Sequence, residues 1–191
     1  MGIPFYQVDV FTDHIFGGNP LAVFTEGQKL KEEDLQKIAR EMNLSETSFV
    51  YPSTKNEADF DVRIFTPFCE IPFAGHPTLG TAYVLRKYGA AKGNPLRLNF
   101  KAGVIPVSTE GDRSFMQHPP AQILHELIPS KIIAEALGIS LSSLDGNLPI
   151  KVVTTGFPAL FVPVNSLTVI NRIEINIQTL NEVLDPLEID M

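Results

Sequence analysis

Hydrophobic and polar residues alternate along several short stretches in the first half of the chain. In residues 3–11, Tyr6, Val8 and Val10 fall on one face, which is the period-two pattern of a half-buried strand. Further stretches of the same kind are predicted to be strands: residues 21–25, 47–51, 60–65, 96–100, 104–109 and 114–117.

Two segments among these strands have the composition of helices. Residues 32–42 place Leu35, Ile38, Ala39 and Met42 in one stripe, which predicts an amphipathic helix on the outside. Residues 78–88 instead distribute apolar side chains around much of the circumference, and such a helix is buried on most sides. Residues 1–118 are therefore predicted to form a domain in which strands surround a central helix.

The chain after residue 118 has a different organisation. Residues 119–122 (Pro-Pro-Ala-Gln) are predicted to be a linker, followed by a short helix that Ser130 caps and Gly138 closes. Strands are expected at residues 150–155 and 159–164, and a helix at residues 177–184. Residues 119–191 thus correspond to the opening of a second domain.

The stretch from Glu70 to Gly80 (EIPFAGHPTLG) resembles a helix start built to hold an anion. Gly75 allows the backbone to approach a ligand, and Pro77 suits the first helical position because its missing N–H costs no hydrogen bond. Free N–H groups and the positive end of the helix dipole favour a carboxylate there. His76 is equally explained as a helix cap or as a ligand-binding residue, and Glu70 could support the turn or orient His76.

Other polar residues have less specific local contexts. Glu46 lies where the outer helix joins an apolar strand, and a carboxylate at the mouth of an apolar site has a raised pKa and can carry protons. From its spacing alone, an exposed acid at a strand end is the favoured explanation. Asn19, in the turn Phe16-Gly-Gly-Asn-Pro20, would by itself be only a turn residue. Cys69 is expected to be a small buried side chain.

Composition narrows the classes of function. The chain has 191 residues, 44% of them hydrophobic and 19% charged, so it can bury a sizeable core. Its net charge is -7 and its 15 Lys and Arg residues are scattered, which argues against nucleic acid. One cysteine and four histidines without ligand spacing provide no zinc cluster. Neither a phosphate loop nor a Gly-x-Gly-x-x-Gly fingerprint is present, so we expect no cofactor.

The sequence also bears on location. No apolar run approaches the roughly 20 residues that span a bilayer. The start Met-Gly-Ile-Pro-Phe-Tyr lacks the basic and apolar regions of a signal peptide. We therefore expect a cytoplasmic protein without a membrane partner.

Four blocks in the first half together resemble one known family. They are Asp9-Val-Phe-Thr12, Phe16-Gly-Gly-Asn-Pro-Leu-Ala-Val23, Asn43-Leu-Ser-Glu-Thr-Ser-Phe-Val50 and Arg63-Ile-Phe-Thr-Pro-Phe-Cys-Glu-Ile-Pro-Phe-Ala-Gly-His-Pro-Thr-Leu-Gly-Thr-Ala82. In this order, over about 80 residues, they resemble the PhzF family of phenazine-biosynthesis-like isomerases. The resemblance implies an α+β, diaminopimelate-epimerase-like fold, in which two similar domains each wrap a barrel-like sheet around a central helix. The active site of that fold lies in the cleft between the domains.

The resemblance also implies roles for individual residues. Glu46 matches the family's acid/base residue, Gly75 and His76 match its substrate-binding pair, and Asn19 falls at a polar position that lines the cleft. The implied reaction is cofactor-free: a carboxylate moves a proton on a small carboxylate-bearing substrate. Related racemases of this fold use two thiols, but Ala74 stands at the first thiol position and Cys69 alone cannot form a pair.

In the family, the second domain supplies an opposing Asp and another Gly-rich helix start, and neither motif occurs before Met191. We therefore expect an incomplete second domain. The alternatives are an isomerase, an isomerase active only when another chain completes it, and a non-catalytic remnant that keeps an anion pocket. An incomplete domain leaves strand edges exposed, which predicts a homodimer or other self-association. A stable monomer in light scattering would contradict that prediction.

Overall fold

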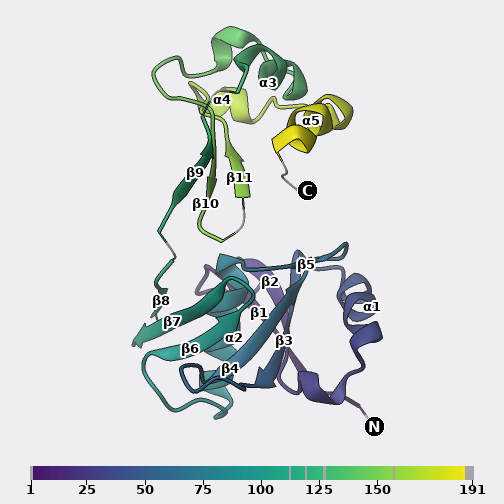
Figure 1. The fold of residues 1–191 in the computed structure, drawn as a ribbon, viewed down its shortest axis with the longest axis vertical. Coiled ribbons are helices and arrows are strands. Elements are labelled where there is room, and N and C mark those ends of the chain that lie inside the picture. Colours follow the sequence, from purple (N-terminus) through teal and green to yellow (C-terminus); the bar gives the residue numbers. More distant parts are fainter. Residues whose placement is uncertain (1, 112, 119, 127, 157, 188–191) are drawn as a thin grey trace. The chain divides into compact units, whose positions relative to one another are not determined.

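The computed structural model describes residues 2–111, 113–118, 120–126, 128–156 and 158–187. The chain divides into two compact units, Met1–His118 and Pro119–Met191. Figure 1 shows both units with their helices and strands labelled.

The first unit contains one eight-stranded mixed sheet. Its strand order is β1-β2-β3-β4-β6-β7-β8, and β5 pairs with β4 outside this path. The pairs β2–β3 and β4–β6 are parallel, and the other pairs are antiparallel. The strands are β1 (Phe5–Val10), β2 (Asn19–Phe24), β3 (Glu46–Pro52), β4 (Phe60–Phe65), β5 (Glu70–Ile71), β6 (Leu96–Phe100), β7 (Gly103–Glu110) and β8 (Arg113–Met116).

Helix α2 (Gly75–Lys87) is the central helix of this unit. It packs against strands from both ends of the sheet order, β1 and β2 as well as β7 and β8, so the sheet curls around it. Val84 and Leu85 of α2 share one buried cluster with Leu21 of β2 and Val107 of β7. The structure therefore confirms the prediction of a sheet wrapped around a buried helix.

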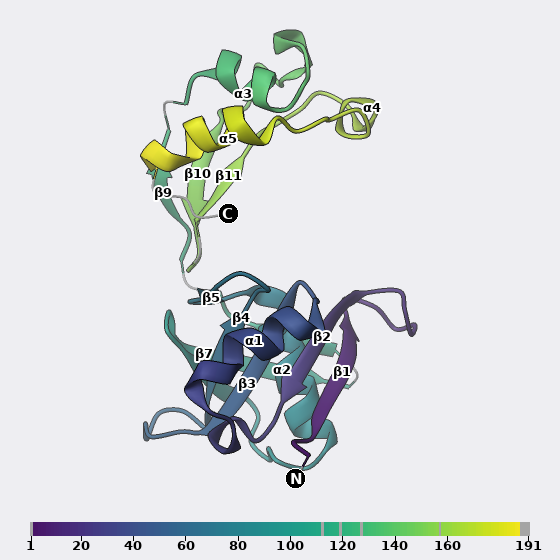
Figure 2. The ribbon, with the colours of Figure 1, turned by 90° about the vertical axis from the view of Figure 1, so that its right-hand side faces the viewer.

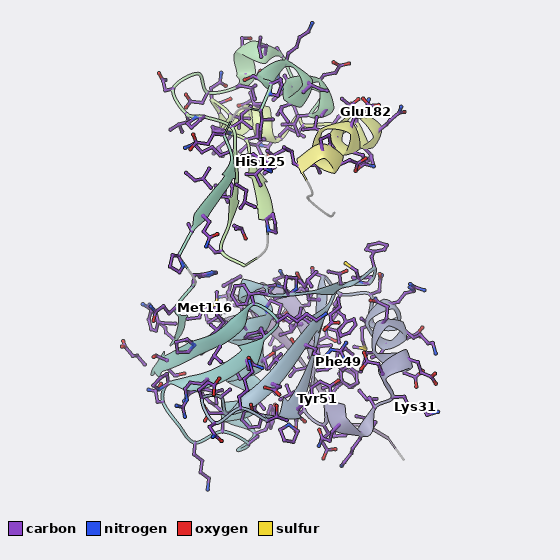
Figure 3. The ribbon with its side chains drawn as sticks, in the orientation of Figure 1. Lys31, Phe49, Tyr51, Met116, His125 and Glu182 are labelled. Atoms are coloured by element: carbon purple, nitrogen blue, oxygen red, sulfur yellow. The ribbon has the colours of Figure 1, made fainter. Side chains whose placement is uncertain are left out.

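Helix α1 (Glu32–Met42) covers the opposite face of the sheet, and Figure 2 shows it on the other side of β3 from α2. Its buried residues Leu35 and Ala39 pack in a second cluster with Phe49. Phe49 lies between β3 and α1 in Figure 3. Asn43 ends α1 in the left-handed conformation (φ 51°), and the chain then turns directly into β3. This turn places Glu46 at the start of a strand in the middle of the sheet.

The second unit is built around a three-stranded antiparallel sheet of order β11-β10-β9. Its small apolar core joins Val152 of the sheet to Ile133 and Val183 of the helices. The elements are β9 (Gln122–His125), β10 (Lys151–Thr154), β11 (Pro158–Phe161), α3 (Ser130–Ala136), α4 (Leu167–Ile170) and α5 (Ile177–Leu184). Short 3-10 turns occur at Gly27–Lys29, Leu141–Ser143 and Asp185–Leu187.

Strands β9 and β11 are the two edge strands of the three-stranded sheet. Self-association of the chain, which was predicted from exposed strand edges, stays a prediction.

In the second unit one strand was missed and one local prediction was wrong. Residues 120 and 121 of the expected linker have no regular structure, but the sequence did not predict β9, which begins at Gln122. All four residues of β9 are exposed and therefore give no alternating pattern. Residue 119 lies outside the described residues. Ser130 does not cap α3; it is the first helical residue, and Pro129 holds the cap position without a side-chain hydrogen bond. Gly138 does follow the helix end with the expected left-handed φ of 64°.

Candidate active site

Helix α2 begins close to the position that its sequence predicts, but its first turn is arranged differently. Ala74 holds the cap position in an extended conformation, without a side-chain hydrogen bond. His76 is therefore the second helical residue and not a cap, and Pro77 is the third helical residue and not the first. The N–H groups of Gly75 and His76 still belong to the first turn, where helix geometry provides no partner. The positive end of α2 therefore remains suited to an anion.

Gly75 leaves room at this helix start. A Cβ atom at Gly75 would lie 3.0 Å from the Cε atom of Met116 and 3.9 Å from Cε1 of His118. Met116, labelled in Figure 3, is the last residue of β8, a strand that packs against α2. A side chain at this position would crowd Met116 and fill space beside the free N–H groups.

Glu46 and His76 come together at the start of α2. Nε2 of His76 lies 3.2 Å from Oε2 of Glu46, and the two side chains are 7% and 17% exposed. The atoms are not aligned as a hydrogen bond, and neither has another hydrogen-bond partner within the described part of the chain. Buried polar atoms are normally paired, so these two are available to the polar groups of a bound molecule.

Asn19, the first residue of β2, is a third polar residue beside Glu46 and His76. Its Nδ2 atom lies 3.3 Å from Nδ1 of His76, across 57 positions of sequence. Strands β2 and β3 are parallel, with Leu21 opposite Glu46, so the starts of both strands lie at the same end of the sheet. This topology brings together all four residues that the resemblance singles out.

Burial shifts the pKa values of both titratable groups. It raises the pKa of the Glu46 carboxyl above its ordinary value. Burial also lowers the pKa of His76, and the Pro20 backbone carbonyl opposes that shift in part. Both directions favour uncharged forms, as expected for groups removed from water. A carboxyl with a raised pKa can both accept and return a proton near neutral pH.

The raised pKa of Glu46 predicts a pH-dependent gain in stability when the residue is replaced. Because the folded pKa lies above the unfolded value, the contribution of Glu46 to stability is largest at low pH and is lost as the pH rises through the folded pKa. Glutamine cannot ionise, so the Glu46→Gln variant does not lose this stability as the pH rises. We expect the variant to unfold with a higher free energy than the unmodified chain at about pH 7, and with a nearly unchanged one at about pH 4. Denaturant unfolding at both pH values tests this, and a variant less stable at pH 7 would contradict it.

Glu70 does not orient His76. Its carboxylate accepts two hydrogen bonds from Arg63, at 2.7 and 2.8 Å, and one from Lys101 at 2.7 Å. The ion pair of Arg63 and Glu70 ties β5 to β4 just before α2 begins. Cys69 is exposed, which corrects its expected burial. The chain turns there between Thr66 and Glu70, and the Thr66 hydroxyl accepts from the Cys69 N–H.

Sequence reasoning missed Ser45 and Pro20, which also contact the group. The Ser45 hydroxyl donates to Oδ1 of Asn19 at 3.3 Å. Their positions beside Glu46 and Asn19 in the matching blocks were the available signal. Over the described residues, no cluster of three or more His, Cys, Asp or Glu side chains is placed to hold a metal ion. None of the helices in this part of the chain is long and apolar enough to cross a membrane.

Comparison with known sequences places the chain in a family. Residues 8–187 match the family of phenazine biosynthesis-like proteins, PhzC-PhzF. The chain belongs to the PhzF family. It is 37% identical, over 172 residues, to the trans-2,3-dihydro-3-hydroxyanthranilate isomerase of Pseudomonas aeruginosa, and covers 59% of that protein with 87% of its own length. An uncharacterized isomerase of Pasteurella multocida is 35% identical over 175 residues, with 90% of this chain and 58% of that protein covered.

Solved PhzF structures have the same fold. A Bacillus anthracis phenazine biosynthesis protein of the PhzF family superimposes with a TM-score of 0.81 at 32% identity, over 96% of this chain and 62% of that one. A predicted epimerase of Pseudomonas aeruginosa gives a TM-score of 0.83 at 30% identity, with 97% of this chain and 67% of that protein covered. A hydroxyproline epimerase of Agrobacterium vitis shares the fold at 12% identity and a TM-score of 0.53, with 76% of this chain and 48% of that protein covered. The chain thus spans about three fifths of the length of most of these relatives.

Proposed function

We propose that this PhzF-family chain is a cofactor-independent isomerase that moves a proton on a small carboxylate-bearing substrate, with Glu46 as the acid/base. The observation that carries the proposal is the mostly buried Glu46 carboxyl, 3.2 Å from His76 at the free N-terminal turn of α2. Burial, a raised pKa and an adjacent anion-binding helix end are the properties that carbon-to-carbon proton transfer requires.

The chemistry follows from these positions. The substrate carboxylate binds the N–H groups of Gly75 and His76 at the positive end of α2. The Glu46 carboxylate takes a proton from one carbon and becomes a carboxylic acid, which then returns the proton to another carbon. The proton count is unchanged, so the step needs no oxidant or co-reactant. The His76 ring stabilises negative charge as the proton leaves, and Asn19 holds the ring.

The first substrate to test comes from the relatives. A protein 37% identical to this one is named for isomerising trans-2,3-dihydro-3-hydroxyanthranilate. This compound is a cyclic amino acid whose carboxylate fits the helix end, and its ring offers carbon-bound protons to Glu46. We propose compounds of this class as substrates.

Binding without turnover is the second candidate, because the relatives' activity belongs to proteins of which this chain spans about three fifths. Calorimetry and product analysis with trans-2,3-dihydro-3-hydroxyanthranilate separate the two. Turnover by the unmodified chain supports the isomerase. Saturable binding that Gly75→Val abolishes, without any product, supports the anion-binding role. If the chain shows neither binding nor turnover with this compound and with simple cyclic amino acids, both candidates fail.

A further inference from the structure

Asn19 lies between a hydroxyl and an imidazole at the candidate site. The Ser45 hydroxyl donates to Oδ1 of the Asn19 amide at 3.3 Å. On its other side, Nδ2 of the amide lies 3.3 Å from Nδ1 of His76. The His76 side chain is only 7% exposed, so water cannot easily replace this contact. The amide therefore has a defined partner at each end.

The chemistry of the amide decides where His76 carries its proton. With the amide in this orientation its nitrogen donates, since an amide nitrogen can only donate, and Nδ1 of His76 accepts with its lone pair. A neutral imidazole has one proton, which then resides on Nε2. Nε2 is the atom that lies 3.2 Å from the Glu46 carboxyl. The contact with Asn19 at Nδ1 therefore determines whether Nε2 presents an N–H or a lone pair to the Glu46 carboxyl.

We propose that Asn19, oriented by Ser45, is a positioning residue that holds neutral His76 as the Nε2–H tautomer. The inference deepens the proposed isomerase function and rests on it for its catalytic meaning. Nε2 of His76 then presents an N–H, and no lone pair, toward Glu46 and the substrate. With no lone pair on Nε2, the ring cannot take the substrate proton, so Glu46 is the only proton carrier of the three residues.

An opposite arrangement is chemically possible and defines the test. The Pro20 backbone carbonyl lies against the ring and raises the pKa of His76. If the Asn19 amide were reversed, Nδ1 would carry the proton, and Nε2 would present a lone pair to Glu46. The two arrangements differ only in which ring nitrogen is protonated, and this difference is directly measurable.

Long-range ¹H–¹⁵N spectra of the full chain at about pH 8, where a histidine of lowered pKa is neutral, distinguish the two tautomers. The native protein is expected to show His76 protonated on Nε2, with the resonance assigned by its loss in His76→Gln. Asn19→Asp replaces the donor with a carboxylate that accepts from Nδ1–H, so the major tautomer should reverse. Asn19→Ala should change the tautomer ratio by up to about tenfold, the scale of one hydrogen bond.

Controls separate this effect from a structural one. Asn171→Asp makes the same change at an exposed position that ends α4, and it should leave His76 unchanged. The resonances of His125, in the other unit, should not shift in any variant that remains folded. A native ring protonated on Nδ1 would overturn the proposal, as would Asn19→Asp with an unchanged Nε2–H. Because the tautomer is measured without substrate, a failed isomerase test leaves this result intact. If the unmodified chain turns over a substrate, Asn19→Asp should lower kcat more than it changes KM.

Discussion

Replacing Glu46 with glutamine is expected to lower the rate of isomerisation by about 10²- to 10⁴-fold, the usual contribution of a positioned acid/base. Glutamine keeps the shape of the side chain but cannot accept a proton from carbon. The fold should persist, because burial already disfavours the charged carboxylate at this position. Initial rates with trans-2,3-dihydro-3-hydroxyanthranilate measure the effect.

Glu41→Gln is the matched control for this variant. Glu41 lies on the exposed side of α1, so the same chemical change there should leave the rate within a factor of about two. A Glu46→Gln variant as active as Glu41→Gln would remove Glu46 from the mechanism while leaving the family assignment intact.

Leu85→Ala is expected to cost about 2–5 kcal/mol of the free energy of unfolding of the first unit. Leu85 is 1% exposed and lies on α2 within the cluster that the curled sheet encloses. Its truncation leaves a cavity between the helix and the strands that surround it. Denaturant unfolding followed by the NMR signals of β2 and β3 measures the loss.

Leu148→Ala provides the comparison, since Leu148 is 58% exposed and lies in the other unit. Its truncation should change the stability of the first unit by less than about 0.5 kcal/mol. Equal losses from the two substitutions would contradict the assignment of α2 as the centre of the first unit's core.

Strong local patterns predicted most of the first unit. The stripe in Glu32–Met42 and the alternation in Phe60–Phe65 gave both elements with the bounds that the structure has. The two-residue strand β5 and the exposed strand β9 were missed, because neither has an apolar pattern to read. Pairing with a neighbouring strand forms these elements, and the sequence of one segment does not reveal its neighbour.

The site could be predicted only through the resemblance. The contact between Asn19 and His76 joins residues 57 positions apart, and no local periodicity signals it. From spacing alone an exposed acid was the favoured explanation of Glu46, since its burial depends on α2 packing behind β3. Of the two explanations left open for His76, the helix cap is contradicted, because Ala74 holds the cap position and Nε2 of His76 lies 3.2 Å from Glu46. Whether the four residues have the proposed roles stays a prediction.

Uptake of solvent deuterium into carbon positions of the isomerised substrate tests the central claim most directly. With the unmodified chain in D₂O, we expect deuterium on carbon in the product of trans-2,3-dihydro-3-hydroxyanthranilate, because the Glu46 proton exchanges with solvent between turnovers. Folded Glu46→Gln protein should show no uptake above background. Deuterium uptake by Glu46→Gln at the rate of the unmodified chain would contradict the assignment of Glu46 as the proton carrier.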